Sequence, residues 1–124
     1  MKSKKKNLVL VVEDDRASGL LYVNFLESKG FKVLIVTDGK SAIDAVIRHP
    51  EINIILMDIQ LPEMDGISTM QEIKKIRKDI PIIAQTAYAM VEDEHRLLKA
   101  GFDHYLAKPF KPTVLHEVLL SCLE

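Results

Sequence analysis

Four apolar runs of the chain end in side chains that can bind a metal ion or a phosphoryl group. NLVLVV ends at Glu13, Asp14 and Asp15, and INIILM ends at Asp58. Acidic groups this close together repel one another, and a divalent cation relieves that repulsion. The available ligands are oxygens, with no His or Cys pair nearby in sequence. They therefore favour Mg²⁺ or Mn²⁺ over Zn²⁺.

The other two runs supply groups that suit phosphoryl chemistry at Asp58. A carboxylate can attack phosphorus as a nucleophile, and the protein must then neutralise charge on the phosphoryl oxygens. Lys108 follows DHYLA and offers a compact cation for those oxygens. Thr86 follows PIIAQ, and its hydroxyl can donate a hydrogen bond that exists only when Asp58 is phosphorylated. Together these residues predict phosphorylation of Asp58 with help from a bound Mg²⁺.

Each of these residues also has a purely structural interpretation. Asp58 could shape a turn or cap a helix. Three consecutive acids exceed what one helix cap needs, and Asp15 fits the capping role best. Lys108 could be a surface lysine, although the proline after it restricts the backbone there. Thr86 could be an ordinary β-branched strand residue.

Strands and helices are expected to alternate along the chain and to position these groups. The apolar runs predict strands at 7–12, 32–36, 52–57, 81–84 and 103–107, and helical periodicity predicts helices at 15–29, 41–48, 67–78, 89–100 and 112–123. Continuously apolar strands joined by helices indicate a parallel sheet covered on both faces. Ligands of such sheets bind beyond the carboxyl ends of the strands. The carboxylates, the hydroxyl and the amine should therefore meet at one edge.

Size and composition fit a single α/β domain. The chain has 124 residues and a net charge of −1, which gives no reason to expect a nucleic acid or an anionic membrane as a partner. The lysine-rich start, residues 1–6, is expected to be a disordered, solvated tail. No apolar stretch approaches the roughly 20 residues that span a bilayer. The single cysteine, Cys122, excludes a disulfide framework within one chain, which fits a reducing, cytoplasmic location.

Four segments resemble the receiver domain of two-component response regulators. They are LVLVVEDD, ILMDIQLPEMDG, IIAQTA and DHYLAKPF, and they stand in the order and at the spacing of that family. The resemblance covers about residues 7–123 and includes receivers found in hybrid sensor kinases. It implies a flavodoxin-like (βα)5 three-layer fold, a parallel sheet of order 2-1-3-4-5, and a receiver domain over residues 7–124.

The resemblance also assigns roles in a metal site. Asp58 matches the phosphoacceptor, and Asp14 matches the carboxylate that binds the metal directly. Glu13 matches the other acidic position, which acts through metal-bound water and is more often an aspartate. The backbone carbonyl of Gln60 would complete the metal shell.

Further roles concern the response to phosphorylation. Lys108 matches the lysine that contacts the phosphoryl group, and the peptide bond between Lys108 and Pro109 is expected to be cis. Thr86 matches the switch hydroxyl. Tyr105 matches an aromatic residue whose ring turns inward on activation.

Three positions are expected to tune the reaction or the loop around it. Gln60 and Tyr88 match positions that line the path of the attacking water, and the bulky Tyr88 is expected to shield the acyl phosphate. Gly66 is expected to relieve backbone strain in the loop after Asp58.

The resemblance implies a switch rather than a turnover enzyme. Asp58 would take its phosphoryl group from a histidine kinase or a histidine phosphotransfer protein, and the domain would catalyse its own phosphorylation and slow dephosphorylation. The output surface would be formed by 89–100, 103–107 and 112–123, and it would act on an unidentified downstream protein. The chain ends soon after its last helix, so no output domain is expected. The last helix lacks the charged pattern of receivers that dimerise through their output surface, which favours a monomer. A stand-alone regulator and an excised piece of a hybrid kinase both stay open.

Two other functions fit part of the pattern. A Mg²⁺-dependent phosphatase with an aspartyl nucleophile would need an acid/base carboxylate just after that nucleophile, but Ile59 and Gln60 follow Asp58. A receiver-like binding module that is never phosphorylated would lack acidic residues or the lysine of the pocket, and this chain has them all.

Overall fold

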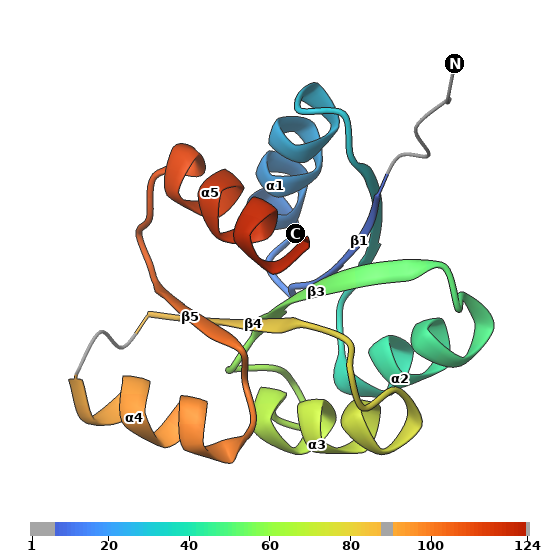
Figure 1. Ribbon diagram of the computed structural model, residues 1–124, viewed down its shortest axis with the longest axis vertical. Helices are drawn as coiled ribbons and strands as arrows, with labels where there is room; N and C mark the ends of the chain where they lie inside the picture. Colours follow the sequence, from blue (N-terminus) through green and yellow to red (C-terminus); the bar gives the residue numbers. More distant parts are fainter. Residues whose placement is uncertain (1–6, 88–90, 124) are drawn as a thin grey trace.

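Strands and helices alternate in the computed structural model, which describes residues 7–87 and 91–123 (Figure 1). The strands are β1 (Leu8–Val12), β2 (Lys32–Val36), β3 (Ile52–Asp58), β4 (Ile82–Thr86) and β5 (His104–Ala107). The helices are α1 (Arg16–Ser28), α2 (Gly39–Arg48), α3 (Gly66–Ile76), α4 (Val91–Ala100) and α5 (Pro112–Leu123). Within the described ranges, no helix has the length and apolar character needed to cross a bilayer.

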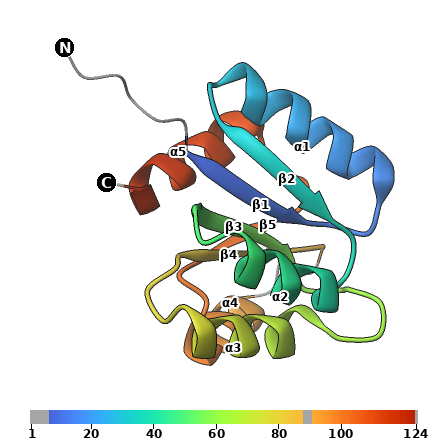
Figure 2. The same cartoon turned by 90° about the vertical axis from the view of Figure 1, so that its right-hand side faces the viewer.

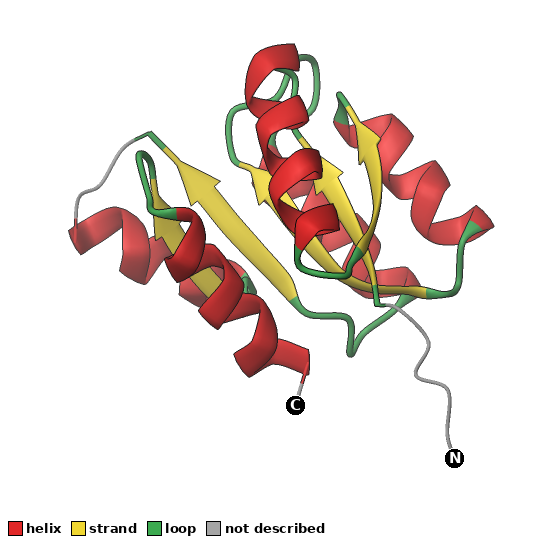
Figure 3. Ribbon diagram, turned by 90° about the horizontal axis from the view of Figure 1, so that it is seen from above, coloured by secondary structure: helices red, strands yellow, loops and turns green. Residues whose placement is uncertain are grey.

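All five strands belong to one parallel sheet of order β2-β1-β3-β4-β5, and they run in the same direction (Figure 3). β1 lies between β2 and β3, and its register pairs Val12 with Val36 on one side and with Met57 on the other. The strand order reverses beside β1, which is where ligands bind in sheets of this kind. The predicted flavodoxin-like fold and its strand order are confirmed.

Helices cover both faces of the sheet (Figures 1 and 2). α1 and α5 pack on one face, and α2, α3 and α4 pack on the other. Because successive side chains of a strand point to opposite faces, Val9 and Val11 of β1 pack with the α1 and α5 side, whereas Leu10 and Val12 pack with the other side. Burial on both faces explains why the central strands are apolar along their whole length.

The first three helices begin with the same local arrangement. An aspartate before the helix accepts a hydrogen bond from the backbone N–H of a serine three residues later: Asp15 from Ser18, Asp38 from Ser41, and Asp65 from Ser68. This bond satisfies one of the free N–H groups of the first turn. The predicted capping role of Asp15 is confirmed.

The predicted element boundaries are correct to within about two residues. The apolar run 81–84 predicts a strand that ends near Thr86, and β4 does continue through Gln85 and Thr86, which are both buried. An apolar pattern stops at the first polar residue, whereas the backbone pairing with β3 and β5 continues beyond it. The two extra residues bring an amide and a hydroxyl into the sheet.

Candidate functional site

Polar side chains from four neighbouring strands line the carboxyl edge of the sheet on the face covered by α1 and α5. Alternation along each strand aligns Glu13 with Val11, Asp58 with Leu56, Gln85 with Ile83, and Lys108 with Leu106. The four apolar members belong to the core beneath α1 and α5. We call Glu13, Asp58, Gln85 and Lys108 the polar row. Glu13, Asp58 and Gln85 are 1%, 6% and 0% exposed, so this edge combines charge with burial.

Lys108 connects the two buried carboxylates of the polar row. Its Nζ lies 3.0 Å from Oε1 of Glu13 and 3.2 Å from Oδ2 of Asp58. Burial alone would lower the pKa of Lys108, but the hydrogen bond from its ammonium to Glu13 and the negative charge of Asp58 raise it above its usual value. Lys108 is therefore a cation at neutral pH. The peptide bond between Lys108 and Pro109 is cis, as expected.

Glu13 is held by three hydrogen-bond donors although it is almost completely buried. Oε1 accepts from Nζ of Lys108 and, at 3.4 Å, from Nε2 of Gln85, and Oε2 accepts from the backbone N–H of Asp15 at 3.1 Å. Burial is the strongest influence on this carboxyl and raises its pKa above the usual value, in spite of Lys108 and the Asp15 N–H. Ionised Glu13 is thus a group that a further cation would stabilise.

Asp58 is fixed by the loop that follows it. Its Oδ1 accepts a hydrogen bond from the backbone N–H of Gln60 at 2.9 Å, and Oδ2 faces Lys108. Gly66 packs so closely on this segment that a Cβ there would collide with the carbonyl oxygen of Asp58. The predicted reason for Gly66, relief of backbone strain, is wrong, because the residue of this loop with positive φ is Glu63, at 64°.

Asp14 completes a group of three carboxylates that fits a divalent cation. It is exposed, and one of its oxygens lies within 4.8 Å of an oxygen of Glu13 and an oxygen of Asp58, all three being mutually this close. Lys108 offsets one of the three negative charges. Oxygen ligands with an excess of negative charge suit Mg²⁺ or Mn²⁺, which retain water molecules in sites with few protein ligands.

Thr86 and Tyr105 lie toward the opposite face of the sheet. Alternation along β4 turns Thr86 to the side of Ala84, and Ala84 pairs in register with Tyr105. Thr86 is 3% exposed, and its carbonyl accepts a hydrogen bond from the backbone N–H of Lys108 at 2.7 Å. Burial, followed by the charges of Asp93 and Glu94, raises the pKa of the half-buried Tyr105. The two predicted switch residues thus share a face that the polar row does not occupy.

Gln60 and Tyr88 are expected to modulate the reaction, and the structure describes only Gln60. Gln60 is exposed directly beside Asp58, and its backbone N–H binds the carboxylate. Tyr88 lies outside the described residues, so its predicted shielding role stays a prediction.

Gln85 is the member of the polar row for which the sequence predicts no role. It pairs in register with Asp58, and its amide reaches Glu13 across the sheet. A usable signal existed in the sequence, because Gln85 is the second residue after Ile83 and thus shares its buried face.

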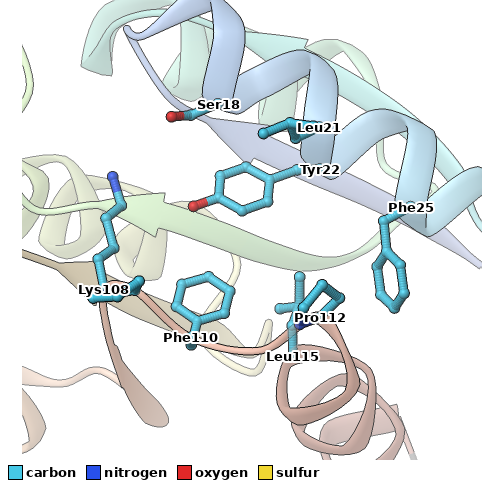
Figure 4. Close-up of a pocket in the computed structure, with 9 residues that line it drawn as sticks. Ser18, Leu21, Tyr22, Phe25, Lys108, Phe110, Pro112 and Leu115 are labelled. Carbon is cyan, nitrogen blue, oxygen red and sulfur yellow. The ribbon is translucent and has the colours of Figure 1, made fainter.

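An apolar pocket of about 410 Å³ opens beside Lys108, between α1 and the segment that follows β5 (Figure 4). Its walls include Tyr22 and Phe110, whose rings stack with centroids 5.9 Å apart and planes 4° from parallel. Leu21, at its rim, is 70% exposed. The polar row therefore adjoins a surface that can take up an apolar group.

Comparison with known proteins finds relatives over nearly the whole chain. A sequence profile of the response regulator receiver domain matches residues 9–120. The sensor histidine kinase GacS of Pseudomonas protegens is 37% identical over an alignment 118 residues long, which covers 91% of this chain but 13% of that kinase. The polar-differentiation response regulator DivK of Brucella ovis is 36% identical over an alignment 118 residues long, which covers 93% of this chain and 94% of DivK. The chain thus spans a small part of the kinase and nearly all of the regulator.

Solved structures agree as well. The receiver domain of sensor histidine kinase PA1611 from Pseudomonas aeruginosa, with a magnesium ion coordinated in its active site cleft, has a TM-score of 0.87 at 36% identity and covers 96% of this chain and 98% of that one. A CheY-like receiver domain protein from Methanospirillum hungatei has a TM-score of 0.87 at 31% identity and covers 96% and 94%. Profile, relatives and fold together show that this chain belongs to the response regulator receiver domain family, the phosphorylation-controlled switch of two-component and phosphorelay signalling.

Proposed function

We propose that Asp58 is the phosphoacceptor and takes its phosphoryl group from a histidine kinase or a histidine phosphotransfer protein. The observation that carries this proposal is the contact of Lys108 with Glu13 and Asp58 at 3.0 and 3.2 Å, beside the exposed Asp14. A nucleophilic carboxylate, a cation for phosphoryl charge and oxygen ligands for a metal ion are then within reach of one another.

Each side chain has a defined task in the transfer. An oxygen of Asp58 attacks phosphorus, a P–O bond forms as the P–N bond to the donor imidazole breaks, and the imidazole nitrogen keeps the electron pair. The ammonium of Lys108 neutralises charge on the phosphoryl oxygens. A bound Mg²⁺ or Mn²⁺ would supply further positive charge to those oxygens. Asp14 would bind that ion directly, Glu13 through a water ligand, and Gln60 through its backbone carbonyl.

Reversal of the signal uses the same groups. Water attacks the phosphorus of the acyl phosphate, inorganic phosphate leaves, and the carboxylate of Asp58 is restored. We propose that the side chains of Gln60 and Tyr88 set how easily water reaches the phosphorus. The domain then catalyses its own phosphorylation and slow dephosphorylation without acting on other substrates.

The response to phosphorylation passes through Thr86 and Tyr105. We propose that the Thr86 hydroxyl donates a hydrogen bond to the phosphoryl group and that Tyr105 changes its position in turn. The surface of α4, β5 and α5 then presents a different shape to a downstream protein.

The chain is proposed to act as a receiver domain over residues 7–124, with 1–6 as a basic tail, and as a monomer in the cytoplasm. The free thiol of Cys122 suits a reducing compartment. Because the donor imidazole must reach Asp58, the donor protein has to approach the carboxyl edge of the sheet, where the pocket lined by Tyr22 and Phe110 lies beside Lys108. Of its relatives, GacS carries its receiver within a kinase and DivK is a regulator of nearly the same length, so either setting suits this chain.

Incubation with acetyl phosphate and Mg²⁺, followed by mass spectrometry, tests the proposal. We expect one added phosphoryl group that hydroxylamine removes, because hydroxylamine cleaves acyl phosphates. EDTA and Asp58→Asn should each abolish it. Asp38→Asn is the matched control, since Asp38 caps α2 away from the polar row, and it should be modified like the wild type. Modification of Asp58→Asn to the wild-type level would refute the assignment.

A further inference from the structure

The Gln85 side chain is an unusual feature of the polar row. It is completely buried on β4, yet it carries an amide where the preceding residue of the same face is Ile83 and the paired residue on β5 is Leu106. An amide buried among apolar side chains costs free energy unless its donors and acceptors are paired. Its presence at this position therefore needs a reason other than packing.

The amide is only partly satisfied. Nε2 of Gln85 donates to Oε1 of Glu13 at 3.4 Å. Oε1 of Gln85, by contrast, is buried and has no hydrogen-bond partner in the part of the chain that the structure describes. Buried polar atoms of proteins are nearly always paired, so an unpaired acceptor on a side chain that also binds one of the three carboxylates indicates a site that is completed by a further donor.

Glu13 is the group on which this amide acts. Its Oε1 accepts hydrogen bonds from Lys108 Nζ at 3.0 Å and from Gln85 Nε2 at 3.4 Å, and these donors come from the residue after β5 and from β4 respectively. Two donors on one oxygen restrict rotation of the carboxylate. Glu13 has one more methylene than aspartate, so its carboxylate reaches further across the sheet toward β4. The longer side chain also has more rotamers, and holding its carboxylate in one position costs more conformational entropy.

We propose that Gln85 is a positioning residue of the divalent-cation site: it holds the carboxylate of Glu13 from across the sheet, and its unpaired oxygen accepts from a water ligand of the cation. This inference rests on the proposed function, because it requires that the three carboxylates bind a cation. Groups that orient metal ligands in this way change metal affinity by about 10–100-fold when they are removed.

Titration of Mn²⁺ followed by electron paramagnetic resonance tests the role of Gln85. Gln85→Met keeps the length of the side chain and removes the amide, and we expect it to weaken Mn²⁺ binding about tenfold. Ile83→Met is the matched control, because Ile83 is equally buried on the same strand and face but lies beneath the polar row. It receives the same new residue and should keep the wild-type affinity.

The Glu13→Asp background separates positioning from packing. The shorter aspartate keeps a carboxylate for the cation but draws it away from β4, so Gln85→Met then removes only the contact with the water ligand and should weaken binding clearly less than in the wild-type background. An equal loss in both backgrounds, an unchanged affinity of Gln85→Met alone, or an equal loss in Ile83→Met would each overturn the inference. If the wild-type protein binds no Mn²⁺, the proposed function itself fails, which is a different result.

Discussion

Replacement of Lys108 by methionine should destabilise the metal-free protein and make its stability depend strongly on Mg²⁺. The ammonium contacts Glu13 and Asp58, which are nearly buried, and Asp14 lies close to both. Methionine has a similar length but no charge. The variant keeps three neighbouring carboxylates and loses the cation that Glu13 and Asp58 share.

The structure gives the size of the effect. Contacts of 3.0 and 3.2 Å correspond to about 5 kcal/mol of Coulomb attraction each at an effective dielectric constant of about 20. Desolvation of the ions offsets much of this, and loss of one partner of a buried ion pair costs roughly 3–5 kcal/mol. The Lys108 side chain is 26% exposed, so we expect the lower end, about 3 kcal/mol in the free energy of unfolding.

Urea unfolding followed by circular dichroism, in EDTA and in Mg²⁺, measures the effect. Mg²⁺ binds only the folded site and stabilises it, and it should bind more tightly where Lys108 no longer opposes it. The gap between variant and wild type should therefore shrink in Mg²⁺. Lys74→Met is the matched control: Lys74 is 22% exposed and pairs with Asp103 at 2.8 Å, outside the three-carboxylate group. Its cost should be the same in both buffers. Two results would refute the reasoning. One is a loss of unfolding free energy in EDTA below about 1 kcal/mol for Lys108→Met, which is what an exposed ion pair contributes. The other is a loss that Mg²⁺ does not change.

Three further predictions concern Glu13, Gly66 and Asp15. Burial raises the pKa of Glu13 in the folded state, so the folded protein holds this proton more tightly than the unfolded chain does. The metal-free protein should therefore lose stability as the pH rises from 4.5, the unfolded pKa, through the folded pKa. In urea melts at a series of pH values, Glu13→Gln should remove this loss. Gly66→Ala should cost about 1–3 kcal/mol in urea melts, because its Cβ collides with the carbonyl of Asp58. Asp15→Ala removes the cap of α1 and should cost about 1 kcal/mol, while Mn²⁺ affinity measured by electron paramagnetic resonance stays at the wild-type value.

The fold could be predicted from the sequence because local pattern and global arrangement agree. Each central strand is apolar along its length, and this requires a covered parallel sheet. Asp15 and Gly30 mark the two ends of α1 by local rules, as a side-chain cap and as a residue with φ of 91°. Glu13, Asp14, Asp58 and Lys108 were predictable as neighbours for the same reason, since the carboxyl ends of parallel strands meet at one edge.

The missed features depend on contacts between distant segments. The role of Gly66 follows from the close approach of α3 to the end of β3. Local composition suggested that Gly66 relieves backbone strain, but the positive φ of this loop belongs to Glu63. The burial of Gln85 follows from its register with Asp58 and from the reach of Glu13 on β1. A polar residue after an apolar run looks like the end of a strand, and only the pairing of the neighbouring strands reveals that the strand continues.

The alternation of side chains on β4 constrains how a change at Asp58 can reach the rest of the molecule. Gln85 faces the polar row, whereas Thr86, the next residue, faces the layer of α2, α3 and α4. Besides the hydrogen bond proposed between the Thr86 hydroxyl and the phosphoryl group, two backbone connections join the polar row to Thr86. One is the peptide bond from Gln85 to Thr86, and the other is the 2.7 Å hydrogen bond from the Lys108 N–H to the Thr86 carbonyl. Because both connections end at Thr86, we expect a displacement of Lys108, or of Gln85 through its contact with Glu13, to reach the same residue of β4.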